Sequence, residues 1–445
     1  MGSDPQPYDA VLARLQAAGR LPSVVAAVAR GGEPVWSGAL SVDPTGPEVS
    51  PGTSYRIGSI TKTLTAVLVL QLRDEGRLGL DDPVGRFVGE AGGYADVSLT
   101  RLLSHTGGLQ SEPVGSWWER TGSGGAAALL AANDGAGRVA AAGEWFHYSN
   151  LGYALLGEVV ARLRGVSWWQ AVRERLLEPL GMSATDYHPP ADHAPGRSVD
   201  HFAHTLTPEP LTDTGAMAPA GQLWSTTADL LRWADFLVTG HPDVLGAATL
   251  EEMARPVPPA ALYGLGVRRA ELGPDGAPGT TLWGHTGSMP GFLASLFVDR
   301  ATRDAAVLLT NATTGLDTAA VPGQLLAGLP VDAEDGWERW APSVAVPAEA
   351  SELLGVWFWG NTAFGLEWHG EQLLLRDLRF AEVEERFTLD GGRIVGTAGY
   401  HRGERLRVHR STDGTVSHLE CATFVYTRTP YDVTVPIPGG HPRSS

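Results

Sequence analysis

The sequence predicts an α+β fold in which an antiparallel sheet is flanked by helices and joined to an all-helical subdomain. A small antiparallel β-domain is expected after it. Strand patterns lie at both ends of the first three quarters of the chain, whereas residues of about 110–240 show the period of helices. Beyond Tyr263 the hydrophobic period changes to two, and after about residue 350 only short alternating runs remain. These three patterns indicate separate domains.

The composition is that of a globular protein with an acidic balance. The chain has 445 residues, 43% of them hydrophobic, and a net charge of −17, which argues against nucleic acid as a partner. Cys421 is the only cysteine, which excludes an intrachain disulfide and a thiolate-rich metal site. Residues 1–30 show no signal-peptide pattern, and no apolar run is long enough to span a membrane. We therefore expect a cytoplasmic protein without a membrane partner. The sequence does not indicate the oligomeric state.

The first elements of the chain have clear patterns. Residues 7–19 form an amphipathic helix pattern. Two strands, 23–30 and 33–40, follow it and are joined at Gly31-Gly32, which is typical of a hairpin. Residues 60–75 then indicate a largely buried helix.

The middle of the chain is helical. A short helix with a glycine stop is expected over residues 98–109, and periodic segments occupy residues 152–164 and 166–177. Thr226-Thr-Ala-Asp229 is a capping box that opens a helix to Val238.

The last part of the chain returns to strands. Four consecutive strands are predicted: 262–269, 280–284, 292–299 and 305–311. We expect residues 1–335 to form the first domain, residues 336–350 a Pro- and Ala-rich linker, and residues 351–445 a β-barrel or sandwich.

The strongest functional signal is a serine followed three residues later by the only lysine of the chain. The other 32 basic residues are arginines, which cannot act as a base near neutral pH. At the start of a helix, Ser59 and Lys62 fall on one face with Cβ atoms about 5–6 Å apart. Burial would lower the pKa of the amine from about 10.4 to roughly 7–8. We predict that Ser59 is a nucleophile and Lys62 its base.

Two further segments could complete such a site. Tyr148 and Asn150 project from one short turn, and a tyrosinate stabilised by Lys62 could take the serine proton. Asn150 could hold Lys62 and bind a substrate carbonyl. Taken alone, a buried tyrosine with a satisfied hydroxyl is the more common reading of this pair.

The second segment that could complete the site is Gly-His-Thr-Gly-Ser, residues 284–288. A strand ending in Thr286-Gly287 would let substrate backbone add along its edge. The N–H groups of Ser59 and Ser288 would form an oxyanion hole, and His285 could orient substrate or tune Lys62.

Three motifs therefore follow one another along the chain: Ser59-x-x-Lys62, Tyr148-x-Asn150 and His285-Thr286-Gly287. In this order and at these separations they resemble the class C β-lactamase and penicillin-binding-protein-like serine hydrolase family, over about residues 8–330. The resemblance implies the β-lactamase-like fold and an acyl-enzyme on Ser59. The family's β-lactamases have Lys-Thr-Gly as third motif, so His-Thr-Gly argues against β-lactamase activity. Relatives with such variants act as esterases, D-amino-acid peptidases or amidases.

Within this family the chain is similar to stand-alone penicillin-binding-protein-type thioesterases. These are cytoplasmic, carry a lipocalin-like β-domain after the catalytic domain, and release or cyclise nonribosomal peptides. The resemblance implies a peptidyl or acyl thioester or ester substrate, which a carrier protein could present. A plain esterase or D-amino-acid amidase, and a non-catalytic ligand sensor, remain as alternatives; the single lysine argues against the sensor.

We expect neither a metal nor a cofactor. His201-x-x-His204 and the pair His105 and His147 are possible metal ligands by type, but no carboxylate or cysteine lies at helical ligand spacing from them. Tryptophans in the helical part could wall a cleft for an apolar peptide, although tryptophans mostly fill cores.

Overall fold

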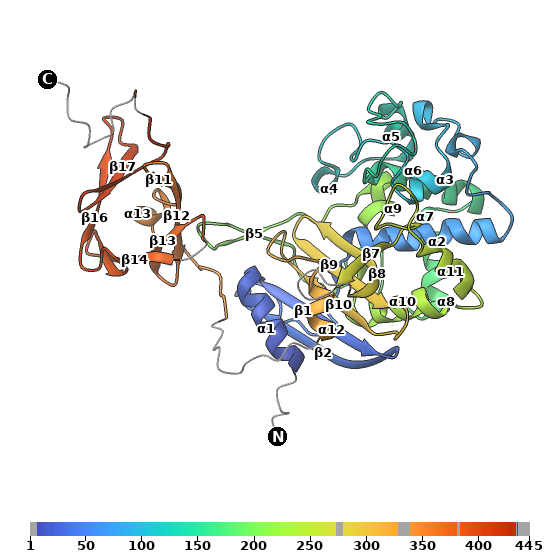
Figure 1. The fold of residues 1–445 in the computed structure, drawn as a ribbon, viewed down its shortest axis with the longest axis horizontal. Helices are drawn as coiled ribbons and strands as arrows, with labels where there is room; N and C mark the ends of the chain where they lie inside the picture. Colours follow the sequence, from blue (N-terminus) through green and yellow to red (C-terminus); the bar gives the residue numbers. More distant parts are fainter. Residues whose placement is uncertain (1–6, 273–278, 328–338, 381–382, 433, 435–445) are drawn as a thin grey trace. The chain divides into compact units, whose positions relative to one another are not determined.

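The computed structural model describes residues 7–272, 279–327, 339–380, 383–432 and 434, and Figure 1 shows their ribbon. The chain divides into two compact units. The first comprises Met1–Ser198 and Pro208–Trp340, and the second comprises Val199–Thr207 and Ala341–Ser445. The short segment Val199–Thr207, which lies within the predicted first domain, thus belongs to the second unit.

A six-stranded antiparallel sheet forms the centre of the first unit, in the order β2-β1-β10-β9-β8-β7. Its strands come from both ends of the unit, as the sequence predicted. They are β1 (Ser23–Arg30), β2 (Glu33–Ser41), β7 (Arg268–Leu272), β8 (Thr280–Met289), β9 (Phe292–Asp299) and β10 (Ala305–Thr310).

Helices cover both faces of this sheet (Figure 1). The alternation of a strand decides which side chain meets which layer. Val24, Ala26 and Val28 of β1 pack with residues of α1 (Pro7–Gly19) and α12 (Val321–Ala327). The intervening side chains of β1 belong to the larger core, which contains α2 (Thr61–Asp74) and α10 (Thr227–Thr239). A strand buried on both faces explains the nearly continuous apolar run of residues 23–29.

The larger core also holds the helices of the middle of the chain: α3 (Leu99–Leu103), α6 (Asn150–Arg164), α7 (Trp168–Val172) and α11 (Ala247–Met253). The remaining helices of this region are the short α4 (Trp118–Thr121), α5 (Ala126–Ala132), α8 (Glu178–Leu180) and α9 (Ala218–Gly221). This is the helical subdomain that the sequence predicted.

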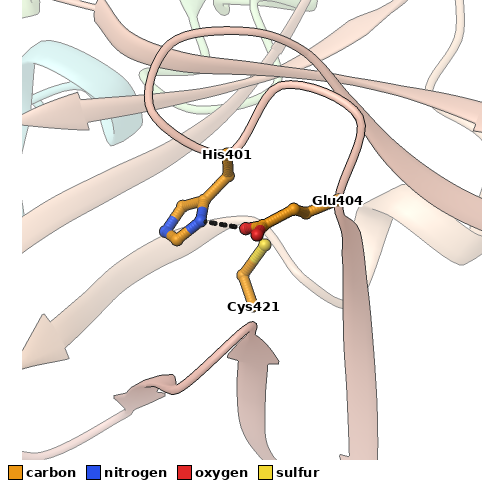
Figure 2. A group of neighbouring side chains, drawn as sticks. All are labelled: His401, Glu404 and Cys421. Atoms are coloured by element: carbon orange, nitrogen blue, oxygen red, sulfur yellow. Dashed lines mark hydrogen bonds and ion pairs between the residues drawn. The ribbon is translucent and has the colours of Figure 1, made fainter.

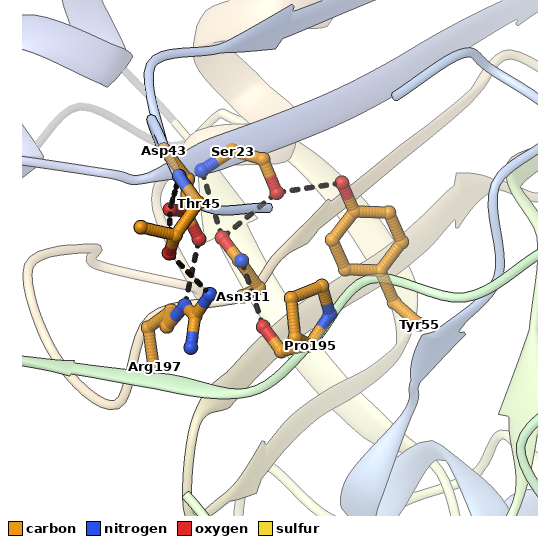
Figure 3. A network of polar contacts seen from close by, with 7 residues as sticks. All are labelled: Ser23, Asp43, Thr45, Tyr55, Pro195, Arg197 and Asn311. Carbon is orange, nitrogen blue, oxygen red and sulfur yellow. Dashed lines mark hydrogen bonds and ion pairs between the residues drawn. The ribbon is translucent and has the colours of Figure 1, made fainter. Parts of the chain in front are cut away.

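A polar network holds the start of β1 against the segment that leads to Ser59 (Figure 3). Asn311 Oδ1 accepts from the backbone N–H of Ser23 at 2.7 Å and from its hydroxyl at 2.8 Å. Because the Ser23 hydroxyl proton is used in this way, the phenol of Tyr55 donates to Ser23 Oγ at 2.8 Å. Tyr55 lies in β3 (Tyr55–Arg56), four residues before Ser59. The network therefore ties the sheet to the segment that carries Ser59.

A closed eight-stranded antiparallel barrel forms the second unit. Its strands are β11 (Gly355–Trp359), β12 (Thr362–His369), β13 (Gln372–Asp377), β14 (Val383–Asp390), β15 (Arg393–Ala398), β16 (Arg405–Arg410), β17 (Val416–Cys421) and β18 (Phe424–Thr427). The pair Phe358 and Thr427 closes it between β11 and β18. Trp357, Phe364 and Phe387 lie in its own hydrophobic core. Closure removes the exposed sheet edges of a small β-domain.

The segment Val199–Thr207 packs within this second unit. The carbonyl of Phe202 accepts from the N–H of Trp368 at 2.7 Å, and the carbonyl of His204 accepts from that of Ser343 at 2.9 Å. The hydrophobic pattern of so short a polar segment carries no signal for such a contact.

Three predicted elements differ from the structure. The helix expected over residues 166–177 ends as α7 at Val172 and continues as a π-helical turn, Arg173–Leu177. The strand expected over residues 262–269 is β7, which starts only at Arg268. The strand expected to end at Gly284 extends to Met289, so His285–Ser288 lie inside β8 and not at its end. In the described part of the chain, no helix is long and apolar enough to cross a membrane.

Candidate active site

Ser59 lies in a 3-10 turn, Gly58–Ile60, that leads directly into α2. This turn touches β8 closely. Gly58 has a φ of +50°, and a Cβ there would stand 2.6 Å from the backbone nitrogen of Ser288. A Cβ at Gly287 would likewise overlap the carbonyl oxygen of Ile57. Glycine is needed at both positions because it alone permits this approach, which brings Ser288 beside Ser59.

Lys62 Nζ is hydrogen-bonded to Ser59 Oγ at 2.9 Å and donates to the carbonyl of Ala220 at 2.7 Å. The lysine side chain is fully buried. Burial lowers its pKa to about 7, although Glu112 and Glu119 act weakly in the opposite direction. Near neutral pH a large fraction of the amine is therefore neutral. A neutral Nζ keeps a proton for Ala220 and offers its lone pair to the serine hydroxyl.

Tyr148 is the third group of this cluster. Its phenol is hydrogen-bonded to Ser59, and Lys62 Nζ lies 5.0 Å from the centre of its ring. Desolvation raises the pKa of Tyr148, and the bond to Ser59 opposes this only in part. Tyr148 is therefore a neutral phenol, so the tyrosinate base considered from the sequence is not the resting form. Burial instead favours the neutral amine of Lys62, which has a lone pair to accept a proton.

Asn150 is not a hydrogen-bond partner of Lys62. It is the first residue of α6, and its side-chain amide donates to Glu112 Oε1 at 2.6 Å. Lys62 instead uses Ser59 and Ala220. Glu112 also accepts from the indole of Trp118 at 2.7 Å. The sequence offered no signal for Glu112, because its position depends on the folding of the loop before α6.

His285 is buried and neutral. Burial, Lys62 and Arg268 lower its pKa to about 3, so it is no general base at physiological pH. Its Nε2 lies 2.8 Å from the hydroxyl of Tyr263, and its Nδ1 donates to the carbonyl of Thr286. The sequence had proposed His285 for orienting substrate or tuning Lys62. The structure places it in the wall of the cavity next to Ser59, where its ring also holds the backbone of Thr286.

Tyr263 joins His285 to a second buried histidine, His105. The backbone N–H of Ser149 donates to His105 Nδ1 at 3.0 Å, and burial holds the pKa of His105 well below its usual value. The proton of this neutral ring therefore lies on Nε2, which donates to the Tyr263 hydroxyl at 3.2 Å. Tyr263 in turn donates to His285. This chain connects the segment of Tyr148 with β8, and the sequence did not reveal it.

Arg268 is the functional candidate that the sequence missed. It lies on β7 opposite Gly284, and its Nη1 is 3.5 Å from Thr286 Oγ1. Its charge adds to the lowering of the His285 pKa and opposes, in small part, the raising of the Tyr148 pKa. The exposed guanidinium thus supplies a cation next to a motif that has histidine where β-lactamases have lysine. Only the register of two strands reveals this neighbour.

A cavity of about 620 Å³ opens over these groups. Ser59, Tyr148, Thr286, Ser288 and Arg268 line it, together with apolar side chains. The structure therefore brings the predicted nucleophile, phenol and strand together in one cavity, and the predicted base, Lys62, lies buried next to Ser59. Such a cavity, with a few convergent polar groups, is the usual form of an enzyme site.

Possible metal ligands occur elsewhere in the described residues, in the barrel. The ligand atoms of His401, Glu404 and Cys421 lie within 4.8 Å of one another (Figure 2), as do those of a second group on β16 and β17. His401 Nδ1 is hydrogen-bonded to Glu404 at 2.6 Å, and burial raises the pKa of the Cys421 thiol to about 11. These donors are thus satisfied or protonated, and we assign no metal to them.

The histidine pairs noted in the sequence do not come together as metal ligands. His204 Nε2 contacts Glu367 at 3.1 Å in the second unit. His105 belongs to the chain through Tyr263, and His147 is bonded to Ser111 at 3.0 Å.

Comparisons with known proteins show which family and which solved structures this chain resembles. The family model described as Beta-lactamase matches residues 8–328, and a domain of unknown function, DUF7586, matches residues 346–428. Penicillin-binding protein 4 of Amycolatopsis lactamdurans is 32% identical over 290 residues, which cover 60% of this chain and 74% of that protein. Some other curated relatives are longer, and the chain spans only 46–49% of their length.

Two solved structures share this fold at similar levels of identity. SurE with bound D-Leu is 25% identical, with a TM-score of 0.56, and the match covers 95% of this chain and 98% of that one. A D-stereospecific amidohydrolase from Streptomyces is 26% identical, with a TM-score of 0.58, and covers 71% of this chain and 98% of that one. The fold and the resemblance inferred from the three motifs are confirmed.

Proposed function

Because the chain belongs to the β-lactamase family of serine hydrolases, we propose that Ser59 attacks an activated carbonyl and carries the acyl group as an ester. One observation carries this proposal. A fully buried lysine with a pKa of about 7 lies 2.9 Å from the serine hydroxyl. Binding alone does not need a titratable amine, so this pair favours a catalyst over a ligand sensor.

In the first half of the reaction, neutral Lys62 accepts the proton of Ser59 Oγ as the oxygen bonds to the carbonyl carbon. The N–H groups of Ser59 and Ser288 stabilise the oxyanion, a contribution of about 10²–10³ in rate for each donor. Tyr148 gives its proton to the leaving group as that bond breaks. The resulting phenolate is stabilised by the Lys62 ammonium.

In the second half, water or an amine attacks the ester and gives its proton to Tyr148. The bond to Ser59 Oγ breaks, and the Lys62 ammonium returns a proton to that oxygen. Each group ends in the state in which it began. The same site therefore performs hydrolysis or acyl transfer, depending on which acceptor reaches the ester.

We propose peptidyl thioesters or esters with a D-residue next to the scissile carbonyl as the substrates, in keeping with a penicillin-binding-protein-type thioesterase that releases or cyclises a nonribosomal peptide. Two similarities support the choice. The SurE structure with D-Leu matches almost the whole chain. The Streptomyces amidohydrolase is D-stereospecific. A carrier protein would present such a thioester.

Arg268 favours a second candidate, the hydrolysis of peptides that end in a free D-amino acid. A guanidinium next to Thr286 is suited to a substrate carboxylate. A peptidyl thioester has no carboxylate on its leaving group, whereas the terminal residue of a peptide has one.

Intact-mass spectrometry would test the proposal and separate the two candidates. Wild type and Ser59→Ala would be mixed with a D-terminated peptidyl N-acetylcysteamine thioester and with the matching peptide extended by D-alanine. We expect an acyl adduct in the wild type alone, formed from the thioester and resolved to cyclic or linear product. An adduct from the D-alanyl peptide alone would favour the second candidate. No adduct from either would contradict the proposed function.

A further inference from the structure

The cavity beside Ser59 has an apolar wall that the proposed chemistry does not use. Phe146 and Leu262 both line it, and their exposed fractions are 42% and 51%. Ala260 and Ala261 extend the same wall. Large apolar side chains placed together at the mouth of a polar site usually mark a surface that a ligand covers.

This wall is held in place before any ligand arrives. The ring of Phe146 packs against His105 and Tyr263, with ring centres 5.9 Å and 5.7 Å apart. The carbonyl of Leu262 accepts from the N–H of Arg269 at 2.9 Å, and that of Tyr263 accepts from Val257 at 3.0 Å. A preformed surface loses little conformational freedom when it binds.

The cavity lies on the side of Ser59 where the leaving group of the substrate would be bound in the proposed reaction. Tyr148, which gives its proton to the leaving group in the proposed reaction, lines it, and so do Thr286 and Arg268. In the proposed reaction the leaving group takes a proton from Tyr148, and the acceptor that replaces it gives a proton to the same residue. They must therefore occupy the same side of Ser59.

We propose that Phe146 and Leu262 form a subsite for a bulky apolar group on the leaving side of the scissile bond, and on the amine acceptor that takes its place. This inference rests on the proposed function and extends it from the reaction to the class of substrate. The preferred leaving group or acceptor carries a large aliphatic or aromatic substituent.

Methyl and benzyl esters of N-acetyl-D-alanine would test this subsite. The two esters share one acyl group, and methanol and benzyl alcohol leave with similar ease. The quantity to compare is the ratio of kcat/KM for the benzyl ester to that for the methyl ester. We expect wild type to favour the benzyl ester by about tenfold or more, because an apolar pocket discriminates by roughly 10–200-fold.

Two variants and one control make the result specific. Leu262→Ser and Phe146→Ala should each lower the ratio severalfold, toward one. Leu211→Ser is the matched control, since Leu211 has an exposed fraction of 48% and does not belong to the described lining of the cavity. It should leave the ratio unchanged.

Intact-mass spectrometry of the same samples shows whether Ser59 is acylated. It therefore separates a failure of the subsite from a failure of the proposed function. The subsite alone would be overturned if Ser59 is acylated but the wild-type kcat/KM ratio is near one. It would also be overturned if Ser59 is acylated and neither variant changes that ratio. If neither ester acylates Ser59, the proposed function fails and the subsite fails with it.

Discussion

Lys62 in the first unit and Glu367 in the barrel are both fully buried residues of a charged type, but their surroundings differ. Glu367 contacts two possible cations, Arg376 at 2.8 Å and His204 at 3.1 Å. Lys62 instead has a hydroxyl and a carbonyl as hydrogen-bond partners. Buried charges with an opposite partner remain charged, whereas a buried amine with neutral partners loses its proton more easily.

Burial of a charged side chain therefore has different consequences in the two units. In the barrel, the charges are paired and fasten the segment Val199–Thr207, which carries His204, to β12 and β13. In the first unit, burial beside neutral partners lowers the pKa of Lys62 to about 7, which suits the amine to its proposed role as a base. We expect changes at the first site to alter stability and changes at the second to alter catalysis.

Replacement of the base should have the largest effect. Lys62→Arg keeps a positive charge but cannot lose a proton near neutral pH. We expect acylation of Ser59 to slow by about 10³-fold or more, in the range of general-base effects. Single-turnover mass spectrometry with an activated ester would measure it, with Ser59→Ala as the null control. Near-normal acylation in Lys62→Arg would refute the assignment of Lys62 as base.

Removal of the paired carboxylate should affect stability instead. Glu367→Gln leaves Arg376 and the buried His204 without their full counter-charge, and we expect a loss of about 3 kcal/mol from the unfolding free energy of the barrel. Thermal or urea unfolding would measure it. Glu420→Gln is the control, because its pair with Arg407 is partly exposed and should contribute under about 1 kcal/mol. Equal effects of the two substitutions would contradict the distinction between them.

Replacement of Lys62 by an apolar residue should raise the unfolding free energy, whereas Glu367→Gln should lower it. The folded pKa of about 7 lies below the unfolded value of about 10.4, so the unfolded chain binds more protons between these pH values. The stability of the wild type therefore rises with pH across this window.

Lys62→Met removes this dependence. We expect the inactive variant to be more stable than wild type by about 2 kcal/mol at pH 7, with a difference that shrinks toward pH 10. Denaturant unfolding at several pH values would measure the difference. A variant that is less stable than wild type throughout would show that Lys62 stabilises the fold.

The sequence predicted those features that local patterns encode. Ser59 and Lys62 lie three residues apart, and the single lysine among many arginines pointed to the buried amine that the structure places 2.9 Å from Ser59 Oγ. The alternation of the barrel strands and the helical period of the middle of the chain predicted these two parts of the fold, because a period of two or 3.6 is a local property.

The features that the sequence could not reveal depend on contacts between distant segments. Arg268 faces Thr286 only through the register of β7 on β8. The chain from His105 through Tyr263 to His285 joins three separate parts of the sequence. The raised pKa of Tyr148 follows from its burial, which no spacing of motifs expresses.

The pH dependence of Ser59 acylation tests the central claim most directly, that burial has made Lys62 a base. The rate with one ester would be measured in single turnover across neutral pH, in wild type and in Lys62→Arg. Only the neutral amine accepts the proton. We therefore expect the acylation rate to rise about tenfold per pH unit up to a pH of about 7 and then to reach a plateau. Lys62→Arg should lack this transition. A wild-type rate that is flat through this range, or the same transition in Lys62→Arg, would contradict the account.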